Sequence, residues 1–122
     1  MRPEEKNAAS IWDMLMAARM AARIMQERSL EAFTAEGQDI VRLAIERELE
    51  ILGEAARRVS DPYKLDHPEI PWKDLIALRN VISHQYEKVN YAVIYRICRE
   101  RLPALITLLE PLVPTPPPEK DE

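Results

Sequence analysis

The stretch IWDMLMAARMAARIM, residues 11–25, decides the fold of this chain. Apolar residues recur along it at intervals of four and three, which is the period of one face of an α-helix. The stripe consists of Ile11, Leu15, Ala18, Ala22 and Met25, and it is widened by Met14, Met16 and Met20. With Pro3 in the first turn, the pattern predicts a helix over about 3–28. The extra apolar surface exceeds what a small bundle buries, which indicates a partner subunit.

A second helix is predicted from positions 36–39 to 59. Its core stripe consists of Val41, Ile45, Leu49, Leu52, Ala56 and Val59, and its solvent-facing residues of Arg42, Glu46, Glu48, Glu50 and Arg57. Gly53 inside this helix costs ~1 kcal/mol relative to Ala. We therefore expect another helix to approach closely at Gly53.

Prolines and caps divide the rest of the chain. The segment 60–71 contains three prolines and is predicted to be a loop. A third helix starts at Trp72, and Asn90 is suited to cap a fourth. Pro103 lies inside the fourth helix and should kink it or split it in two.

These elements predict an all-α bundle of four to five helices in one domain, residues 1–113. The composition agrees, since 47% of the 122 residues are apolar, only 6% are aromatic and Gly occurs twice. Residues 114–122, PTPPPEKDE, are expected to form a disordered, Pro-rich acidic tail.

Charge and cysteine content narrow the class of protein. The net charge is −4 and the pI about 5.3, so the whole molecule does not attract nucleic acid. RNA contacts would depend on local clusters, of which the candidates are Arg57/Arg58 and Arg96/Arg99/Arg101. The single cysteine, Cys98, excludes an internal disulfide and is expected in the core. With no signal sequence and no run of ~18 apolar residues, we expect a cytoplasmic protein.

The segment RNVISHQY, which begins at Arg79, combines a cation, an imidazole and a phenol within eight positions. On a helix, Asn80 and His84 stack one turn apart, and Arg79 and Ser83 stack beside them. Tyr86 follows just past the expected helix end and can fold back toward them. The core side of the same helix consists of Leu75, Leu78 and Ile82. The polar group is therefore expected to be exposed as a unit.

Such a group fits RNA cleavage without a metal, in which the 2′-OH attacks the adjacent phosphorus. A histidine with a pKa near ~6.5 can take or give the proton, and an arginine can bind the phosphate oxygens. Asn80 could orient the phosphate or the imidazole. With His84 as the one histidine at the site, acid and base would be shared across a dimer, or one role left to water. By residue type alone, a solvated or interface surface is the favoured interpretation of this cluster, and catalysis is the alternative.

Other candidate residues are weaker. His67 lies in the expected loop and is interpreted as a surface residue. Two distant histidines and one buried cysteine are too few for a zinc site, and no cofactor motif is present. Glu54 is interpreted as a helix-surface charge that could also pair with Arg79.

Three segments in order closely resemble the HepT family, the HEPN-domain ribonuclease toxins of HepT–MntA (type VII) toxin–antitoxin systems. They are EILGEA at 50–55, HPEIPW at 67–72 and LRNVISHQY at 78–86. The similarity covers roughly residues 8–112. It implies an up-and-down HEPN bundle that dimerises with two motif copies at one cleft and cuts RNA, as an endo- or exoribonuclease, without a metal.

The resemblance also implies residue roles. Arg79 and His84 match the catalytic pair, and Asn80 the polar position after the arginine. Ser83 and Glu54 are further candidates for a supporting role, from their positions beside Arg79. Tyr86 matches the tyrosine to which the partner, an MntA-like nucleotidyltransferase, transfers AMP from ATP. The implied partners are RNA, a second copy of the chain and this antitoxin, in a dimer or a larger heteromer. The alternative function is a non-catalytic HEPN module that partners a nucleotidyltransferase and senses RNA or nucleotide.

Overall fold

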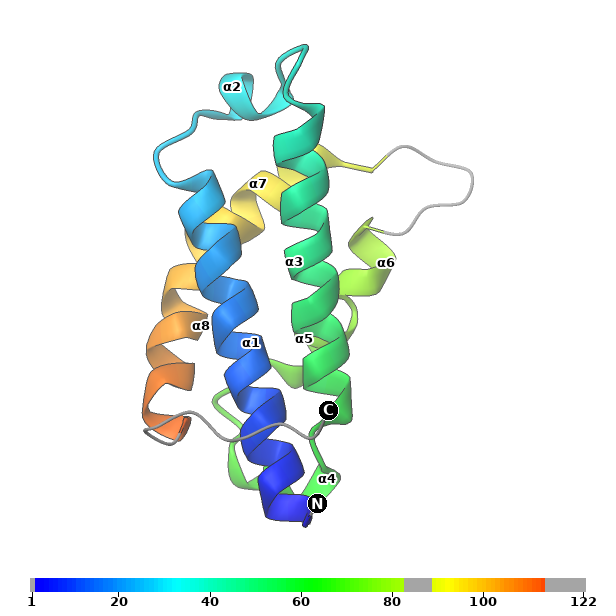
Figure 1. Cartoon of the computed structure of the whole chain (residues 1–122), viewed down its shortest axis with the longest axis vertical. Helices are drawn as coiled ribbons and strands as arrows, with labels where there is room; N and C mark the ends of the chain where they lie inside the picture. The colour runs from blue at the N-terminus through cyan, green and yellow to red at the C-terminus, as the bar shows by residue number, and fades with distance from the viewer. Residues whose placement is uncertain (1, 83–88, 114–122) are drawn as a thin grey trace.

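The computed structural model describes residues 2–82 and 89–113, and every regular element within them is helical. Figure 1 shows long helices that stand side by side, with short helices at both ends. The predicted all-α bundle is therefore confirmed. The expected tail 114–122 and the motif residues 83–86 lie outside the described residues.

In chain order the described elements are α1 (Pro3–Met25), α2 (Leu30–Thr34), α3 (Asp39–Arg58), α4 (Asp61–Asp66), α5 (Trp72–Ile76), α6 (Leu78–Ile82), α7 (Tyr91–Arg96), the π-helical η1 (Ile97–Arg101), α8 (Leu102–Leu109) and the 3₁₀-helical η2 (Glu110–Leu112). The long helices α1 and α3 run antiparallel and form the largest contact between elements. The α8 helix packs against α1, whereas α5 and α6 pack against α3 (Figure 1). The chain thus alternates in direction, as in an up-and-down bundle.

The core is built from the predicted stripes of α1 and α3. Fully buried residues of these stripes are Ile11, Leu15, Ala18, Ile45, Leu49, Leu52 and Ala56. Burying one such Leu or Ile side chain contributes roughly 1.5–3 kcal/mol. The extra methionines of α1 were expected to add apolar surface for a partner subunit. This holds only in part, because Met14 is fully buried within the chain itself. Met16 and Met20 remain 44% and 38% exposed.

The expectation of a loop over 60–71 is partly wrong, because α4 occupies its first half. The Ser60 hydroxyl accepts a hydrogen bond from the Tyr63 N–H at 3.4 Å, and Pro62 lies in the first turn, where its missing N–H is not needed. The Asn7 side chain donates to the Ser60 hydroxyl at 2.9 Å and accepts from the Ser60 N–H at 3.0 Å. Pro62 therefore fits the start of this helix rather than preventing it.

The helix α2 was not predicted, and it changes the environment of Arg42. Ser29 caps α2 by accepting from the Ala32 N–H at 3.0 Å. Arg42 of α3 donates to the carbonyl oxygens of Phe33 at 2.8 Å and Ala35 at 3.0 Å, and its side chain is only 13% exposed. The prediction that Arg42 faces solvent is therefore wrong, since α2 provides carbonyl acceptors for it.

The predicted third helix is present as two short helices, α5 and α6, separated at Ala77. The predicted close approach at Gly53 is confirmed beside this break. A methyl group added at position 53 would lie 2.9 Å from the Leu75 carbonyl oxygen and 3.6 Å from Leu78 Cβ. Only a glycine leaves room for the backbone of α5 to lie this close to α3.

We expect Gly53→Ala to lower the free energy of unfolding by about 1 kcal/mol, although alanine is the better helix former. Overpacking against the α5 backbone costs about 1–3 kcal/mol, whereas the gain in helix propensity is ~1 kcal/mol. Urea unfolding followed by circular dichroism measures the difference. A variant more stable than the wild type would show that α5 can move away from α3 without cost.

The C-terminal helix is split ahead of Pro103, as predicted. Residues 97–101 form one π-helical turn, in which the Leu102 N–H donates to the Ile97 carbonyl oxygen. Pro103 then falls in the first turn of α8, where no N–H donor is required. Asn90 caps α7 as predicted, since its side-chain oxygen accepts from the N–H groups of residues 92 and 93 at 3.1 and 3.3 Å.

Cys98 lies in the π-helical turn and is buried, which confirms it as a core residue. Burial raises the pKa of its thiol to about 12, so the thiol is protonated at neutral pH. None of the helices in the described ranges combines the length and apolarity needed to cross a membrane.

Candidate active site on α6

The helix α6 separates an apolar side from a polar side, as the spacing predicted. Leu75 and Leu78 are buried, with 7% and 5% of their surfaces exposed, whereas Arg79 and Asn80 are exposed. Ile82 is half-buried at the end of the helix. The first two residues of the motif thus project from a helix that Leu78 anchors in the core, just after Leu75 of α5.

The remaining site residues predicted from the sequence, Ser83, His84 and Tyr86, lie outside the described residues. They follow α6 directly in the chain. The described chain resumes at Val89, just before α7, and α6 and α7 are in contact. The described residues on either side of this segment therefore belong to elements that contact each other, α6 before it and α7 just after it.

Arg79 lines two polar clefts between α6 and α3. The first, of about 400 Å³, is lined by Glu46, Glu50, Glu54, Arg79 and Ile82. The three glutamates are spaced by four residues, so they occupy one face of α3. The second cleft, of about 330 Å³, extends toward α5 and adds Arg57, Lys73 and Asn80 to its lining. The arginine of the motif therefore lies at an open, charged cleft.

Glu54 lines both clefts with Arg79 but is bonded elsewhere. Its carboxylate accepts a hydrogen bond from Arg57 at 3.1 Å, and the described residues contain no ion pair between Glu54 and Arg79. The hydrogen bond from Arg57, followed by the charges of Arg57, Arg58 and Arg79, lowers the pKa of Glu54 below its usual value. Glu54 is thus ionised at neutral pH and contributes negative charge next to Arg79.

Glu46 is not the freely solvated residue that was predicted, because Tyr91 at the start of α7 donates to it at 3.0 Å. Burial, then the hydrogen bond to Glu46, raises the pKa of the Tyr91 phenol. The Arg42 guanidinium lies 5.4 Å from the centre of the Tyr91 ring. Sequence reasoning missed this group, because nothing local indicates that residues 46 and 91 meet.

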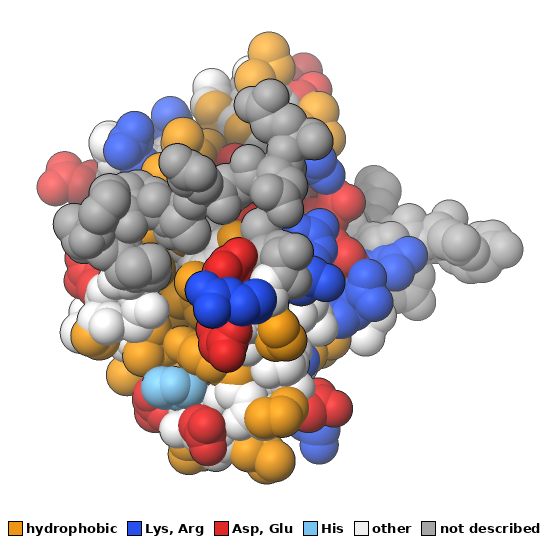
Figure 2. All heavy atoms as spheres, turned by 60° about the horizontal axis from the view of Figure 1, so that its bottom comes forward, with side chains coloured by type: hydrophobic (Ala, Val, Ile, Leu, Met, Phe, Trp, Pro, Cys, Tyr) orange, Lys and Arg blue, Asp and Glu red, His pale blue; other side chains and the backbone are white. Residues whose placement is uncertain are grey.

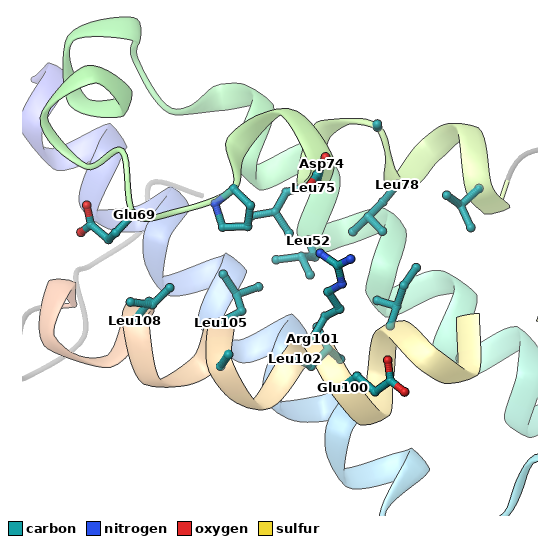
Figure 3. Close-up of a pocket in the computed structure, with 15 residues that line it drawn as sticks. Leu52, Glu69, Asp74, Leu75, Leu78, Glu100, Arg101, Leu102, Leu105 and Leu108 are labelled. Carbon is teal, nitrogen blue, oxygen red and sulfur yellow. The ribbon is translucent and has the colours of Figure 1, made fainter. Parts of the chain in front are cut away.

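An apolar pocket of about 540 Å³ lies on the other side of α6, between α5–α6 and η1–α8. Leucines from four elements converge in it, and Arg101 projects into the same space (Figure 3). Arg99 donates to the Gln26 carbonyl oxygen. The two arginine clusters predicted as RNA contacts therefore differ in position. Arg57 lines the Arg79 cleft, whereas Arg99 bonds to Gln26 and Arg101 lines the apolar pocket.

His67, the histidine within the described residues, contacts side chains of the fold rather than a cleft. Its ring centre lies 4.4 Å from that of Tyr63, its Nδ1 is 3.3 Å from a Glu69 carboxylate oxygen, and its carbonyl oxygen accepts from the Trp72 indole at 2.9 Å. Figure 2 shows one face of the molecule, on which basic, acidic and apolar side chains are mixed. Within residues 2–82 and 89–113, no three His, Cys, Asp or Glu side chains gather in a way that could hold a metal ion.

The described part of the chain is an all-α up-and-down bundle that exposes Arg79, the arginine of the Arg-x4-His motif, at a cleft. A sequence model of the family described as "Ribonuclease HepT-like" matches residues 14–112. This match spans most of the chain, and the chain therefore belongs to the HepT-like ribonuclease family.

Individual relatives agree with the family match. The chain is 30% identical over 93 residues to "Probable ribonuclease HepT" of Thermococcus cleftensis, which covers 76% of this chain and 83% of that protein. It is 29% identical over 97 residues to "Putative RNase MJ1380" of Methanocaldococcus jannaschii, which covers 80% of this chain and 87% of that protein. No solved structure matches the chain.

Proposed function

We propose that this protein is the ribonuclease toxin of a HepT–MntA (type VII) toxin–antitoxin system, with Arg79 and His84 as its catalytic pair. The observation that carries the proposal is the exposure of Arg79 at a cleft, on the helix that leads directly to His84, in a chain of a ribonuclease family. The alternative, a HEPN module that binds RNA or nucleotide without cleavage, is an outcome of the experiments below.

In the proposed reaction the RNA 2′-OH attacks the adjacent phosphorus and expels the 5′-oxygen of the next nucleotide. The Arg79 guanidinium binds the non-bridging oxygens, whose negative charge increases in the transition state. His84 takes the proton of the 2′-OH or supplies one to the departing oxygen. Asn80 and Ser83 orient the phosphate, and Glu54 balances the charge of Arg79 when RNA is absent.

A homodimer is part of the proposal, because two proton-transfer groups are needed and each chain supplies one histidine to the motif. The exposed Met16 and Met20 on α1 provide apolar surface for contact with a second copy or with the antitoxin. Light scattering at micromolar concentration measures the assembly, and an active monomer would contradict it.

Regulation in this proposal occurs at Tyr86. A partner nucleotidyltransferase transfers AMP from ATP to the phenol oxygen with release of pyrophosphate, which places a phosphodiester next to Arg79. The modified tyrosine then occupies the position of the substrate phosphate. The toxin and antitoxin act together in the cytoplasm, where RNA and ATP are both present.

We expect the purified protein to cleave RNA at an undiminished rate in EDTA and to leave 2′,3′-cyclic phosphate ends. Both results follow from attack by the 2′-OH with proton transfer by side chains alone. Mass spectrometry of the cleaved ends identifies the product. Loss of cleavage in EDTA with recovery on addition of magnesium would contradict the mechanism, and RNA binding without cleavage would favour the alternative function.

A further inference from the structure

We propose that the cleft between α3 and α5–α6 holds a second phosphate of a single RNA strand, next to the phosphate bound by Arg79. Lys73 and Arg57 are its ligands. This inference rests on the proposed function, because it assumes that RNA reaches Arg79. It adds a binding subsite that extends the substrate contact beyond the reacting phosphate.

The geometry of the cleft brings cations from separate elements together. Arg57 comes from the last turn of α3, Lys73 from α5 and Arg79 from α6, and all three line the same 330 Å³ cleft. Gly53, Ile76 and Ala77 line it as well, and none of these three carries a charge. A strand that contacts Arg79 can therefore continue along this cleft to Lys73.

The acidic residues of the cleft have arginine partners of their own. Glu50 pairs with Arg47 at 3.3 Å, and Glu54 pairs with Arg57 at 3.1 Å. Within the described ranges, neither Lys73 nor Arg79 forms an ion pair. By formal charge the lining of the cleft has three cations, Arg57, Lys73 and Arg79, against the two carboxylates, although the whole chain has a net charge of −4.

Arg57 can bind a phosphate without first losing a strong contact. Its side chain is 64% exposed, and an exposed ion pair such as that with Glu54 contributes at most a small net stabilisation. Only one of its terminal nitrogens bonds to Glu54, so other N–H donors remain. The lowered pKa of Glu54, which is caused first by Arg57, is consistent with positive potential in this cleft.

The test measures binding without cleavage. The probes are fluorescein-labelled 2′-O-methyl oligoribonucleotides, ten nucleotides of U or A, whose blocked 2′-oxygen cannot attack. Wild type, Lys73→Gln and Lys73→Arg are compared, with Lys6→Gln as a control of equal charge change on exposed α1, outside the cleft lining. Fluorescence anisotropy is recorded over a series of salt concentrations.

We expect Lys73→Gln to weaken binding about fivefold at low salt. It should also reduce the slope of log affinity against log salt by about 0.7, the value for one phosphate contact on a single strand. Lys73→Arg and Lys6→Gln should bind as the wild type does. A dinucleotide with a single phosphate, and AMP alone, should bind Lys73→Gln and wild type equally.

Three results would overturn the subsite: no binding of the decamers by the wild type, equal decamer affinity of Lys73→Gln and wild type, or an equal Lys73 dependence for AMP. The proposed function is tested separately by cleavage of unmodified RNA. Cleavage by the wild type together with an unchanged Lys73→Gln affinity removes only the subsite. Binding that depends on Lys73 in a protein that never cleaves RNA removes only the nuclease.

Discussion

We expect His84→Ala to lower the rate of RNA cleavage by about 10²–10⁴-fold, the usual contribution of a side chain that transfers a proton in the transition state. Growth arrest on expression of the protein alone should be lost with it. The fold should remain, because α6 contacts the core through Leu78. The polar side of α6, along which the motif begins, is exposed.

The matched control is His67→Gln, which removes the other histidine of the chain. His67 contacts Tyr63 and Glu69 and lines neither polar cleft, so the variant should cleave RNA as the wild type does. Circular dichroism establishes that both variants are folded. A folded His84→Ala protein that cleaves RNA at the wild-type rate would remove this imidazole from the mechanism.

We expect Tyr86→Phe to remain an active nuclease and to escape neutralisation by the partner nucleotidyltransferase completely. The phenol takes no part in proton transfer in the proposed reaction, but it is the oxygen to which AMP is joined. In the modified wild type, Arg79 would bind the AMP phosphate through charge-assisted hydrogen bonds worth ~1.5–3 kcal/mol each. This interaction competes directly with RNA.

Co-expression with the partner, followed by growth and intact-mass measurements, tests this switch. Tyr95→Phe is the matched control, since the Tyr95 hydroxyl donates to the Arg28 carbonyl oxygen at 3.0 Å and is part of the fold. That variant should still gain the mass of AMP and be silenced. If the partner silences Tyr86→Phe as fully as the wild type, inhibition occurs by binding rather than by modification of this residue.

Part of the candidate site could be read from residue spacing. The burial of Leu75 and Leu78 and the exposure of Arg79 and Asn80 follow from the helical period alone. The cleft could not be read in this way, because its α3 wall lies about 25 residues before Arg79. Glu54 was interpreted as a surface charge or a partner of Arg79, and its hydrogen bond to Arg57 instead depends on which side chains are in reach.

The sequence by itself determined the long helices, their core faces and the cap of α7. Local periodicity in residues 11–25, the Asn90 cap and the interruption at Pro103 act over a few neighbouring residues, and each was confirmed. Only the tertiary structure decided that Arg42 is covered by α2 and that Arg57, Lys73 and Arg79 share a cleft. Such arrangements depend on the packing of helices far apart in the chain, and no local pattern encodes that packing.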